Sequence, residues 1–166
     1  YWSIGNGAAD TTFSVGGWFW IDSAGSGDRY AMGRYNTGTN KREWILKLPN
    51  GDGKAMLIRT DESENANPAI YTVTDAALPT DTWVHVIATS DDSEHPSGMN
   101  IYVDGVLVAS TDTDNAGYVA TENHVQTTQF AHVADTPSNL FQGKMAGGPL
   151  GLSFVQKELT AAEVKD

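Results

Sequence analysis

The stretch that decides the fold is Met99-Asn100-Ile101-Tyr102-Val103-Asp104-Gly105-Val106-Leu107-Val108-Ala109-Ser110-Thr111. Apolar and polar side chains alternate on both sides of Asp104-Gly105, and this alternation is typical of paired strands with one buried face. A type I′ turn needs positive φ at both central residues, a conformation that Gly adopts freely and Asp tolerates. The stretch therefore predicts an antiparallel hairpin with Asp104 in its turn.

Strand-like segments of the same kind recur along the chain at spacings of roughly 8–15 residues, with turn residues between them. In Phe13–Ile21 the odd-numbered side chains share one face, and Trp18 and Trp20 share the other. Trp83–Ala88 is another such strand, whereas helical patterning is found only at Thr160–Glu163, which has the pattern of a capping box. The pattern predicts an all-β fold, a two-sheet antiparallel β-sandwich of the jelly-roll type with a short C-terminal helical turn.

The bulk properties of the chain limit its class. Its 166 residues predict a single domain, residues 1–166, and the chain opens with Tyr1, so we expect a domain excised from a longer protein. The formal net charge of −11 makes nucleic acid a poor partner, because phosphate backbones would be repelled. No apolar run approaches the roughly 18 residues that a membrane helix needs, so no membrane insertion is expected.

Four motifs, in order along nearly the whole chain, resemble the laminin G-like branch of the concanavalin A-like lectin/glucanase superfamily. They are Phe13-Ser14-Val15-Gly16-Gly17-Trp18-Phe19, Leu78-Pro79-Thr80-Asp81-Thr82-Trp83-Val84-His85-Val86, Ile101-Tyr102-Val103-Asp104-Gly105-Val106-Leu107-Val108, and Phe141-Gln142-Gly143-Lys144-Met145 with Leu159-Thr160-Ala161-Ala162-Glu163-Val164. The resemblance implies the jelly-roll fold. It also implies a non-catalytic module that binds glycans or proteins, located outside the cell, on a cell surface or in a virion.

The residues give little support to catalysis. Glycosidases hold two carboxylates across a cleft, and the glucanase relatives carry theirs in a Glu-x-Asp-x-x-Glu arrangement on one strand. This chain has no such run, and its nearest acidic cluster, Asp61-Glu62-Ser63-Glu64, has the surroundings of a loop. We therefore predict that the protein is not an enzyme. A degenerate glycosidase is kept as an alternative to the two functions given at the end of this subsection. Activity that depends on Glu62 or Glu64 would support it.

A carbohydrate site needs flat aromatic surfaces for the apolar faces of sugar rings, and polar side chains for the hydroxyl groups. Trp18 is expected to be structural, because the family carries a Trp there, and Tyr35 and Tyr118 lie in loop-like segments where rings would be exposed. The predicted ligand-binding residues are Trp20, Arg34, Tyr35, Asn36, Trp44 and Tyr118. The alternative is that these aromatic rings belong to the core and the polar residues to solvated turns.

Calcium is the predicted cofactor, because Ca²⁺ takes six to eight oxygen ligands from carboxylate-rich loops. The predicted ligands come from two loops and are Asp61, Glu62, Glu64, Asp112 and Asp114. Solvated acidic loops are the alternative interpretation. In the family an Asp after the closing strand often helps to hold calcium, but the corresponding stretch, Lys144–Pro149, has no carboxylate. We expect the Gly-rich segment Ala146–Gly151 to form a bend.

Two functional hypotheses follow. The first is a carbohydrate-binding or adhesion module of a larger extracellular or virion protein, whose partner is a glycan or a host or virion surface protein. The second is a structural or protein-interaction domain of the kind that decorates phage capsids or tails. A symmetric oligomer that buries the aromatic face would favour the second hypothesis, and an open aromatic groove would favour the first. The sequence leaves the oligomeric state open.

Overall fold

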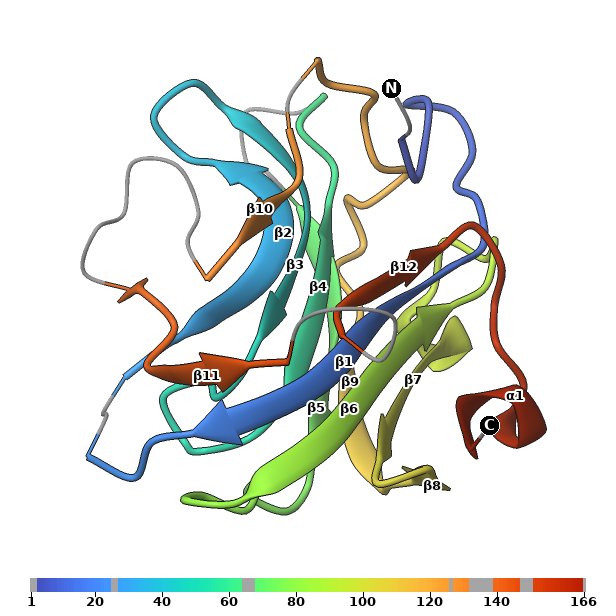
Figure 1. Ribbon diagram of the computed structural model, residues 1–166. Coiled ribbons are helices and arrows are strands. Elements are labelled where there is room, and N and C mark those ends of the chain that lie inside the picture. Colours follow the sequence, from blue (N-terminus) through green and yellow to red (C-terminus); the bar gives the residue numbers. More distant parts are fainter. Residues whose placement is uncertain are drawn as a thin grey trace.

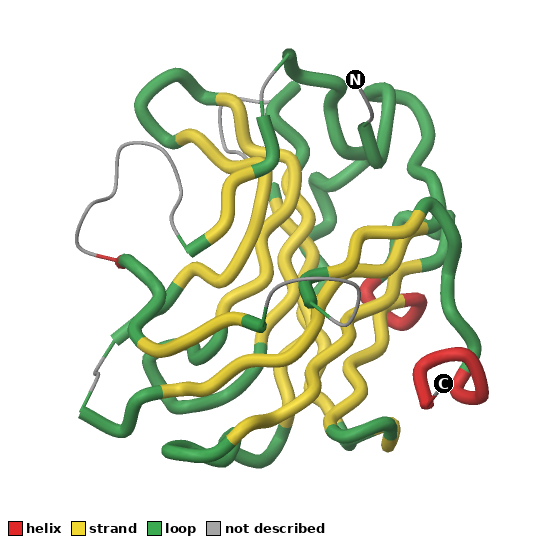
Figure 2. The backbone as a smooth tube through the Cα atoms, in the orientation of Figure 1, coloured by secondary structure: helices red, strands yellow, loops and turns green. Residues whose placement is uncertain are grey.

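The computed structural model describes residues 3–24, 27–63, 68–125, 127–131, 139–146 and 151–165. Within these residues, two antiparallel sheets pack face to face (Figures 1 and 2), as the sequence predicts. The front sheet has the order β11-β1-β6-β7-β8, with β12 also paired to β1. Its strands are β1 (Phe13–Ile21), β6 (Trp83–Ser90), β7 (Met99–Val103), β8 (Val106–Leu107), β11 (Gly143–Met145) and β12 (Ser153–Val155).

The back sheet has the order β10-β2-β3-β4-β5-β9. Its strands are β2 (Tyr30–Asn36), β3 (Lys41–Lys47), β4 (Met56–Thr60), β5 (Ala69–Thr74), β9 (Ser110–Thr113) and β10 (Gln129–Phe130). A short 3-10 turn, η1 (Pro96–Gly98), precedes β7, and one helix, α1 (Ala161–Lys165), ends the described chain. In the described residues no helix is long and apolar enough to cross a membrane.

The core lies between the sheets and follows the alternation in β1. Phe13 and Phe19 point inward and are fully buried, whereas Trp18 between them points outward and is exposed. Across the core, the ring of Trp44 in β3 lies 5.8 Å from that of Phe13. Each such large apolar side chain contributes about 1.5–3 kcal/mol when it is fully buried. Burial of the inward side chains therefore fixes which side chains of β1 face the solvent.

The hairpin forms, but its second strand is shorter than expected. Asp104 has φ 50° and Gly105 has φ 76°, so the predicted turn with two positive φ values is confirmed. The strand that follows, β8, ends at Leu107, and β9 begins at Ser110 in the other sheet, where it pairs with β5. The expectation of one continuous strand to Thr111 is therefore wrong. Because Val108 packs against the core, the chain crosses from one sheet to the other at this point.

The C-terminal segment covers part of the outer face of the front sheet. The N–H of Thr160 donates to Glu163 Oε2 at 3.0 Å and the N–H of Glu163 donates to Thr160 Oγ1 at 3.4 Å, which confirms the capping box. Val164 of α1 packs on Ile87 and Tyr102, two outward side chains of β6 and β7. Helix α1 thus covers the part of the outer face around Ile87 and Tyr102. Residues 147–150 of the predicted bend lie outside the described residues.

Candidate ligand-binding site

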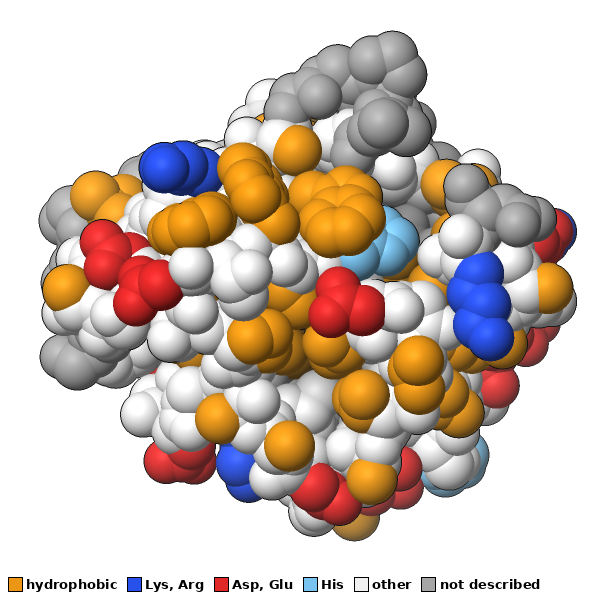
Figure 3. All heavy atoms as spheres, turned by 60° about the horizontal axis from the view of Figure 1, so that its bottom comes forward, with side chains coloured by type: hydrophobic (Ala, Val, Ile, Leu, Met, Phe, Trp, Pro, Cys, Tyr) orange, Lys and Arg blue, Asp and Glu red, His pale blue; other side chains and the backbone are white. Residues whose placement is uncertain are grey.

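Strands β1 and β6 place four aromatic side chains together on the outer face of the front sheet. In their register, Trp18 lies opposite His85 and Trp20 lies opposite Trp83. We call these four residues the aromatic platform. Trp18 is 39% exposed and Trp83 is 41% exposed, although both are large apolar side chains. Figure 3 shows hydrophobic side chains gathered on one face beside a histidine and acidic groups. Exposed apolar patches of this kind mark binding surfaces.

The rings of the platform are arranged in two pairs. The ring centroids of Trp18 and His85 lie 5.1 Å apart at an angle of 34°. Those of Trp20 and Trp83 lie 6.1 Å apart in an edge-to-face arrangement. The ammonium group of Lys144, on β11, lies 4.8 Å from the centroid of the Trp20 ring. Trp20 therefore contacts both Lys144 and Trp83, and these contacts hold its ring in the platform.

A groove of about 530 Å³ lies beside the platform. Its floor contains Trp18, His85 and Ile87. Its walls contain Asp104, from the turn between β7 and β8, and Lys165, from α1. The groove thus joins an aromatic surface to polar side chains that come from separate parts of the sequence. This is the composition typical of sites for small polar ligands.

The polar groups of the groove are held in place by hydrogen bonds. The backbone N–H of His85 donates to Asp104 Oδ1 at 2.9 Å, and the N–H of Asp104 donates to the carbonyl of His85 at 2.8 Å. Burial lowers the pKa of His85, and the charge of Asp104 opposes this shift. Burial therefore favours the neutral form of His85. Hydrogen bonds from Lys157 and Thr160 lower the pKa of Glu163, on the groove wall, to about 2.

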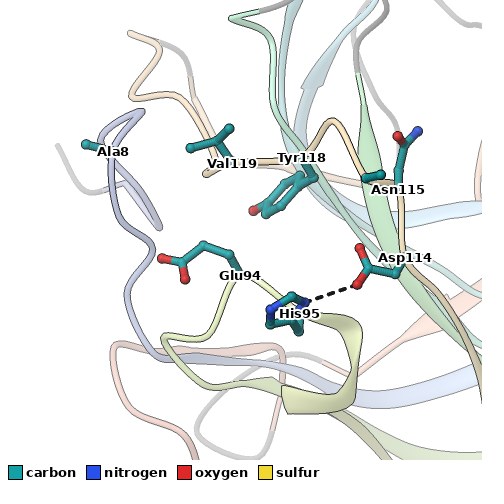
Figure 4. A pocket seen from close by; sticks show the side chains of 8 residues that line it. Ala8, Glu94, His95, Asp114, Asn115, Tyr118 and Val119 are labelled. Carbon is teal, nitrogen blue, oxygen red and sulfur yellow. Dashed lines mark hydrogen bonds and ion pairs between the residues drawn. The ribbon is translucent and has the colours of Figure 1, made fainter.

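A second cavity, of about 700 Å³, opens beside Tyr118 (Figure 4). Glu94, His95 and Asp114 line it, and His95 Nδ1 lies 3.0 Å from Asp114 Oδ2. The aromatic residue in its wall, Tyr118, is only 8% exposed. The cavity is larger than the groove, but its large ring, Tyr118, is buried, and the exposed ring that lines it is the small imidazole of His95, paired with Asp114. We therefore place the candidate site at the platform and not here.

The predicted ligand-binding residues do not form one site, although all six are described. Trp20 lies on the platform. Arg34 is buried, with Nη1 2.9 Å from Glu43 Oε2, and Trp44 is fully buried in the core. The prediction that Arg34 and Trp44 meet a ligand is wrong, because neither side chain reaches the surface. The guanidinium of Arg34 instead holds a buried carboxylate, and the indole of Trp44 packs between the sheets.

The remaining three predicted residues lie away from the platform. The expectation that Tyr118 exposes its ring is wrong, because the ring is buried and its hydroxyl donates to Asp10 Oδ2 at 2.6 Å. Tyr35 is half-buried on the back sheet, with its ring centroid 5.9 Å from Arg42 Cζ. Asn36 begins the turn after β2, where its Oδ1 accepts a hydrogen bond from the N–H of Thr39 at 2.9 Å.

Trp18, Trp83 and His85 are the residues that the sequence interpretation missed. Trp18 was expected to be structural, yet it is one of the most open large rings of the described chain. Its alternation with Phe13 and Phe19 was a signal for an outward position. What the sequence did not contain was the pairing of β1 with β6, which brings Trp83 and His85 beside it.

The predicted calcium ligands have other partners in the structure. Asp61 is buried and accepts hydrogen bonds from the N–H groups of Ser63 and Val119, at 2.8 and 3.0 Å. Glu62 lies 2.7 Å from Arg42, Asp114 contacts His95, and Asp112 is an exposed residue of β9. Glu64 lies outside the described residues. Within the described ranges no three His, Asp or Glu side chains are grouped closely enough to hold a metal, and calcium stays a prediction.

The chain belongs to the concanavalin A-like lectin/glucanases superfamily, since a laminin G-type family model with this description matches residues 2–165. This confirms the family resemblance and, with the two sheets, the predicted fold class. No curated protein matches the sequence.

Solved structures resemble the fold at low sequence identity. A candidate carbohydrate-binding protein from Bacteroides ovatus has a TM-score of 0.58 at 16% identity, over 95% of this chain and 43% of that one. The ligand-binding domain of botulinum neurotoxin serotype D, in complex with N-acetylneuraminic acid, has a TM-score of 0.61 at 15% identity, over 95% of this chain and 36% of that one. A heptameric SAP-like pentraxin from Limulus polyphemus has a TM-score of 0.54 at 13% identity, over 95% and 71%. The chain thus spans less than half of the first two proteins.

Proposed function

We propose that this protein is a non-catalytic carbohydrate-binding module whose site is the aromatic platform and its groove. The observation that carries the proposal is the exposure of Trp18 and Trp83, at 39% and 41%, beside a groove of about 530 Å³. The C–H faces of a sugar ring pack on an open indole, as other apolar surfaces do, while polar side chains at the rim bond its hydroxyl groups. Trp18 supplies the first kind of contact, and Asp104 and Lys165 supply the second.

The structural neighbours support this class of ligand. One is described as a candidate carbohydrate-binding protein, and another was solved with N-acetylneuraminic acid. A third neighbour is botulinum neurotoxin type C, whose cell entry is described as dependent on interaction with two ganglioside molecules. These descriptions belong to proteins of 13–16% identity, so they support a sugar-binding role here only by shared architecture.

A binding role also fits the carboxylates at the groove better than catalysis does. A glycosidase needs one carboxylate as an acid and another as a nucleophile or base. At this groove, Asp104 accepts a hydrogen bond from the backbone of β6, and Glu163 is engaged by Thr160 and Lys157. Both carboxylates thus have structural partners. We place the module in a larger extracellular, cell-surface or virion protein, with glycans as its partners.

One observation favours a second function, that of a protein-interaction domain. Val106 and Leu107, in edge strand β8, are 59% and 53% exposed. Exposed apolar edges of this kind are templates for contact with another chain. Such a domain would dock on a virion or host surface protein through β8. A Val106→Lys/Leu107→Lys double variant that abolishes oligomerisation or partner binding, while sugar binding stays absent, would support this function.

Glycan-array screening followed by isothermal titration calorimetry tests the proposed function. We expect Trp18→Ala to weaken sugar binding by about tenfold or more, which corresponds to 1.4 kcal/mol or more. Phe130→Ala is the matched control, because Phe130 is 48% exposed but lies on β10 of the back sheet. If no sugar in a broad panel binds, or if both variants bind as the unmodified protein does, the platform is not a carbohydrate site.

A further inference from the structure

Two of the three platform indoles are open to a ligand, and one is shielded. Lys144 lies over the ring of Trp20, and the edge contact with Trp83 occupies another side of it. Trp18 and Trp83 keep about two fifths of their surface exposed. Trp18 also lines the groove, together with His85. A sugar can therefore stack on Trp18 and on Trp83, whereas Trp20 supports its neighbours.

The two open indoles are diagonal neighbours on the same face. Trp18 pairs with His85, and Trp83 lies two residues before His85 on β6, so the outward side chains of Trp18 and Trp83 belong to adjacent strands. Such diagonal positions are about 7–8 Å apart in an antiparallel pair. This separation lets two neighbouring rings of one oligosaccharide lie on two different indoles. A single sugar ring would use only one of them.

The charges at the groove are balanced. Asp104 contributes a negative charge and Lys165 a positive one, and Glu163 is paired with Lys157. Burial lowers the pKa of His85, which lines the groove, and so favours its uncharged form. Lys144 lies outside this groove, over Trp20. The groove around Trp18 therefore presents no excess of positive charge to an anion, whereas Lys144 places one positive charge over Trp20, the neighbour of Trp83.

Two further properties disfavour an anionic sugar. The chain as a whole carries a formal net charge of −11, which repels polyanions at long range. The Asp104 carboxylate accepts hydrogen bonds but donates none, so it can bind a sugar hydroxyl and would repel a sugar carboxylate or sulfate. Its position is fixed by the backbone of His85. An uncharged, hydroxyl-rich ligand meets none of these penalties.

We infer that the site takes an uncharged oligosaccharide of two or more rings, with one ring on Trp18 in the groove and the next on Trp83. The inference rests on the proposed carbohydrate-binding function and adds the class of sugar. Asp104 accepts a hydrogen bond from a hydroxyl of the ring on Trp18, and Lys165 donates a hydrogen bond to an oxygen of the same ring. On the ring that lies in the groove, carboxylate and sulfate groups of uronic-acid, sialylated and sulfated glycans are disfavoured.

Calorimetry with sugars of matched length tests the inference. The uncharged probes are the tetrasaccharides of cellulose, xylan, mannan, laminarin and amylose, with their monosaccharides. The anionic probes are sialyllactose, tetragalacturonate and a heparin tetrasaccharide. We expect an uncharged tetrasaccharide to bind at least about tenfold more tightly than its monosaccharide, with an affinity that changes less than about twofold between 50 and 500 mM NaCl, since neutral ligands are not screened.

Two variants assign the subsites. We expect Trp83→Ala to remove the gain of the tetrasaccharide over the monosaccharide, while Phe130→Ala keeps it. Asp104→Asn should weaken binding of the uncharged probe several-fold and strengthen binding of the anionic probes, because the negative charge is lost. The turn should keep its structure, because Asn tolerates positive φ and keeps the Oδ1 acceptor. Asp52→Asn, in an exposed turn between β3 and β4, is the matched charge control.

The outcomes separate the inference from the function on which it rests. Tighter binding of an anionic probe that depends on Trp18 and weakens with salt would overturn the inference and keep the carbohydrate-binding function. A monosaccharide that binds as tightly as its tetrasaccharide would do the same. Binding of no probe of either class would overturn both.

Discussion

Trp18 lies directly opposite His85 across the pairing of β1 with β6, and their ring centroids are 5.1 Å apart on the solvent side of the front sheet. The same strand buries Phe13 and Phe19 completely on its other side. One strand therefore supplies both the core and the platform. Changes at outward positions should alter binding with little effect on folding, and changes at inward aromatic positions should do the reverse.

Trp18→Ala and Trp44→Ala test this separation. We expect Trp44→Ala to lower the free energy of unfolding by about 3–5 kcal/mol, because the fully buried indole would leave a cavity between the sheets. Trp18→Ala should lower it by about 1 kcal/mol, a usual value for a partly exposed residue. Urea denaturation followed by circular dichroism measures both. Equal losses in the two variants would contradict the assignment of Trp18 to the surface.

Local patterns in the sequence account for the fold. The alternation of Phe13–Ile21, the Asp104-Gly105 turn and the Thr160–Glu163 capping box depend on residues close to one another, and each forms as predicted. The length of β8 does not follow from such a pattern, because the crossing to the back sheet is set by packing of Val108 on the core. Tertiary contacts thus decide where an otherwise regular strand ends.

The candidate site could be predicted only in part, because its residues meet through strand pairing. From its local sequence, Tyr118 is expected to be an exposed loop residue. In the structure its hydroxyl donates a hydrogen bond to Asp10, which is far away in the sequence, and the ring is buried. Arg34 likewise looks available until Glu43 pairs with it inside the sandwich. The face of Trp20 was predicted, but the identity of its neighbour Trp83 depends on the β1–β6 register. Long-range pairing of this kind leaves no periodic signal.

The titration of His85 is a second prediction. We expect its midpoint below the ordinary value of 6.5, because burial beside Trp18 disfavours the imidazolium, with Asp104 opposing this in part. NMR of the imidazole protons against pH measures the midpoint. Asp104→Asn should lower it further, since the charge that raises the pKa is removed. A lowered pKa also means that protonation favours the unfolded state, so this group's contribution to stability is lost as the pH falls below 6.5.

A midpoint of His85 at or above 6.5 would contradict this prediction. It would show that the ring is more hydrated than the groove allows, or that the charge of Asp104 outweighs burial. In that case sugar binding should weaken below pH 6.5 as the platform gains charge. With a lowered pKa, any such weakening should instead begin at a lower pH.

Glu43 provides a third prediction, on stability. Burial raises the pKa of Glu43 from 4.5 to about 7, although Arg34 and the backbone N–H of His124 favour its charged form. Between these two pH values the folded state binds more protons than the unfolded state, so this group makes the free energy of unfolding fall as the pH rises from 4.5 to 7. The contribution is constant above that range.

Glu43→Gln isolates this contribution, because the amide keeps the shape of the side chain and cannot ionise. We expect the difference in unfolding free energy between the two proteins to shift in favour of the variant by up to about 3 kcal/mol between pH 4.5 and pH 8. Urea titrations at pH 4.5, 6 and 8 measure it. A difference that does not change with pH would mean that Glu43 titrates normally in the folded protein.

The last prediction concerns Thr160, which caps the helix that walls the groove. Its Oγ1 accepts the N–H of Glu163 at 3.4 Å and donates to Glu163 Oε2 at 3.0 Å. Thr160→Ala should lower the free energy of unfolding by about 1 kcal/mol, as the loss of an N-cap does. Since Val164 is the contact of α1 with Ile87 and Tyr102, the loss should open the helix locally before the sheets unfold.

Hydrogen exchange measured by mass spectrometry distinguishes this local effect. We expect faster exchange in residues 161–165 and unchanged exchange in β1 and β6, together with weaker sugar binding, because Lys165 would leave the groove wall. Thr80→Ala, in the exposed loop before β6, is the matched control and should change neither. If Thr160→Ala accelerates exchange in α1 but leaves sugar binding unaltered, α1 is not part of the binding site, and the ligand contacts the platform alone.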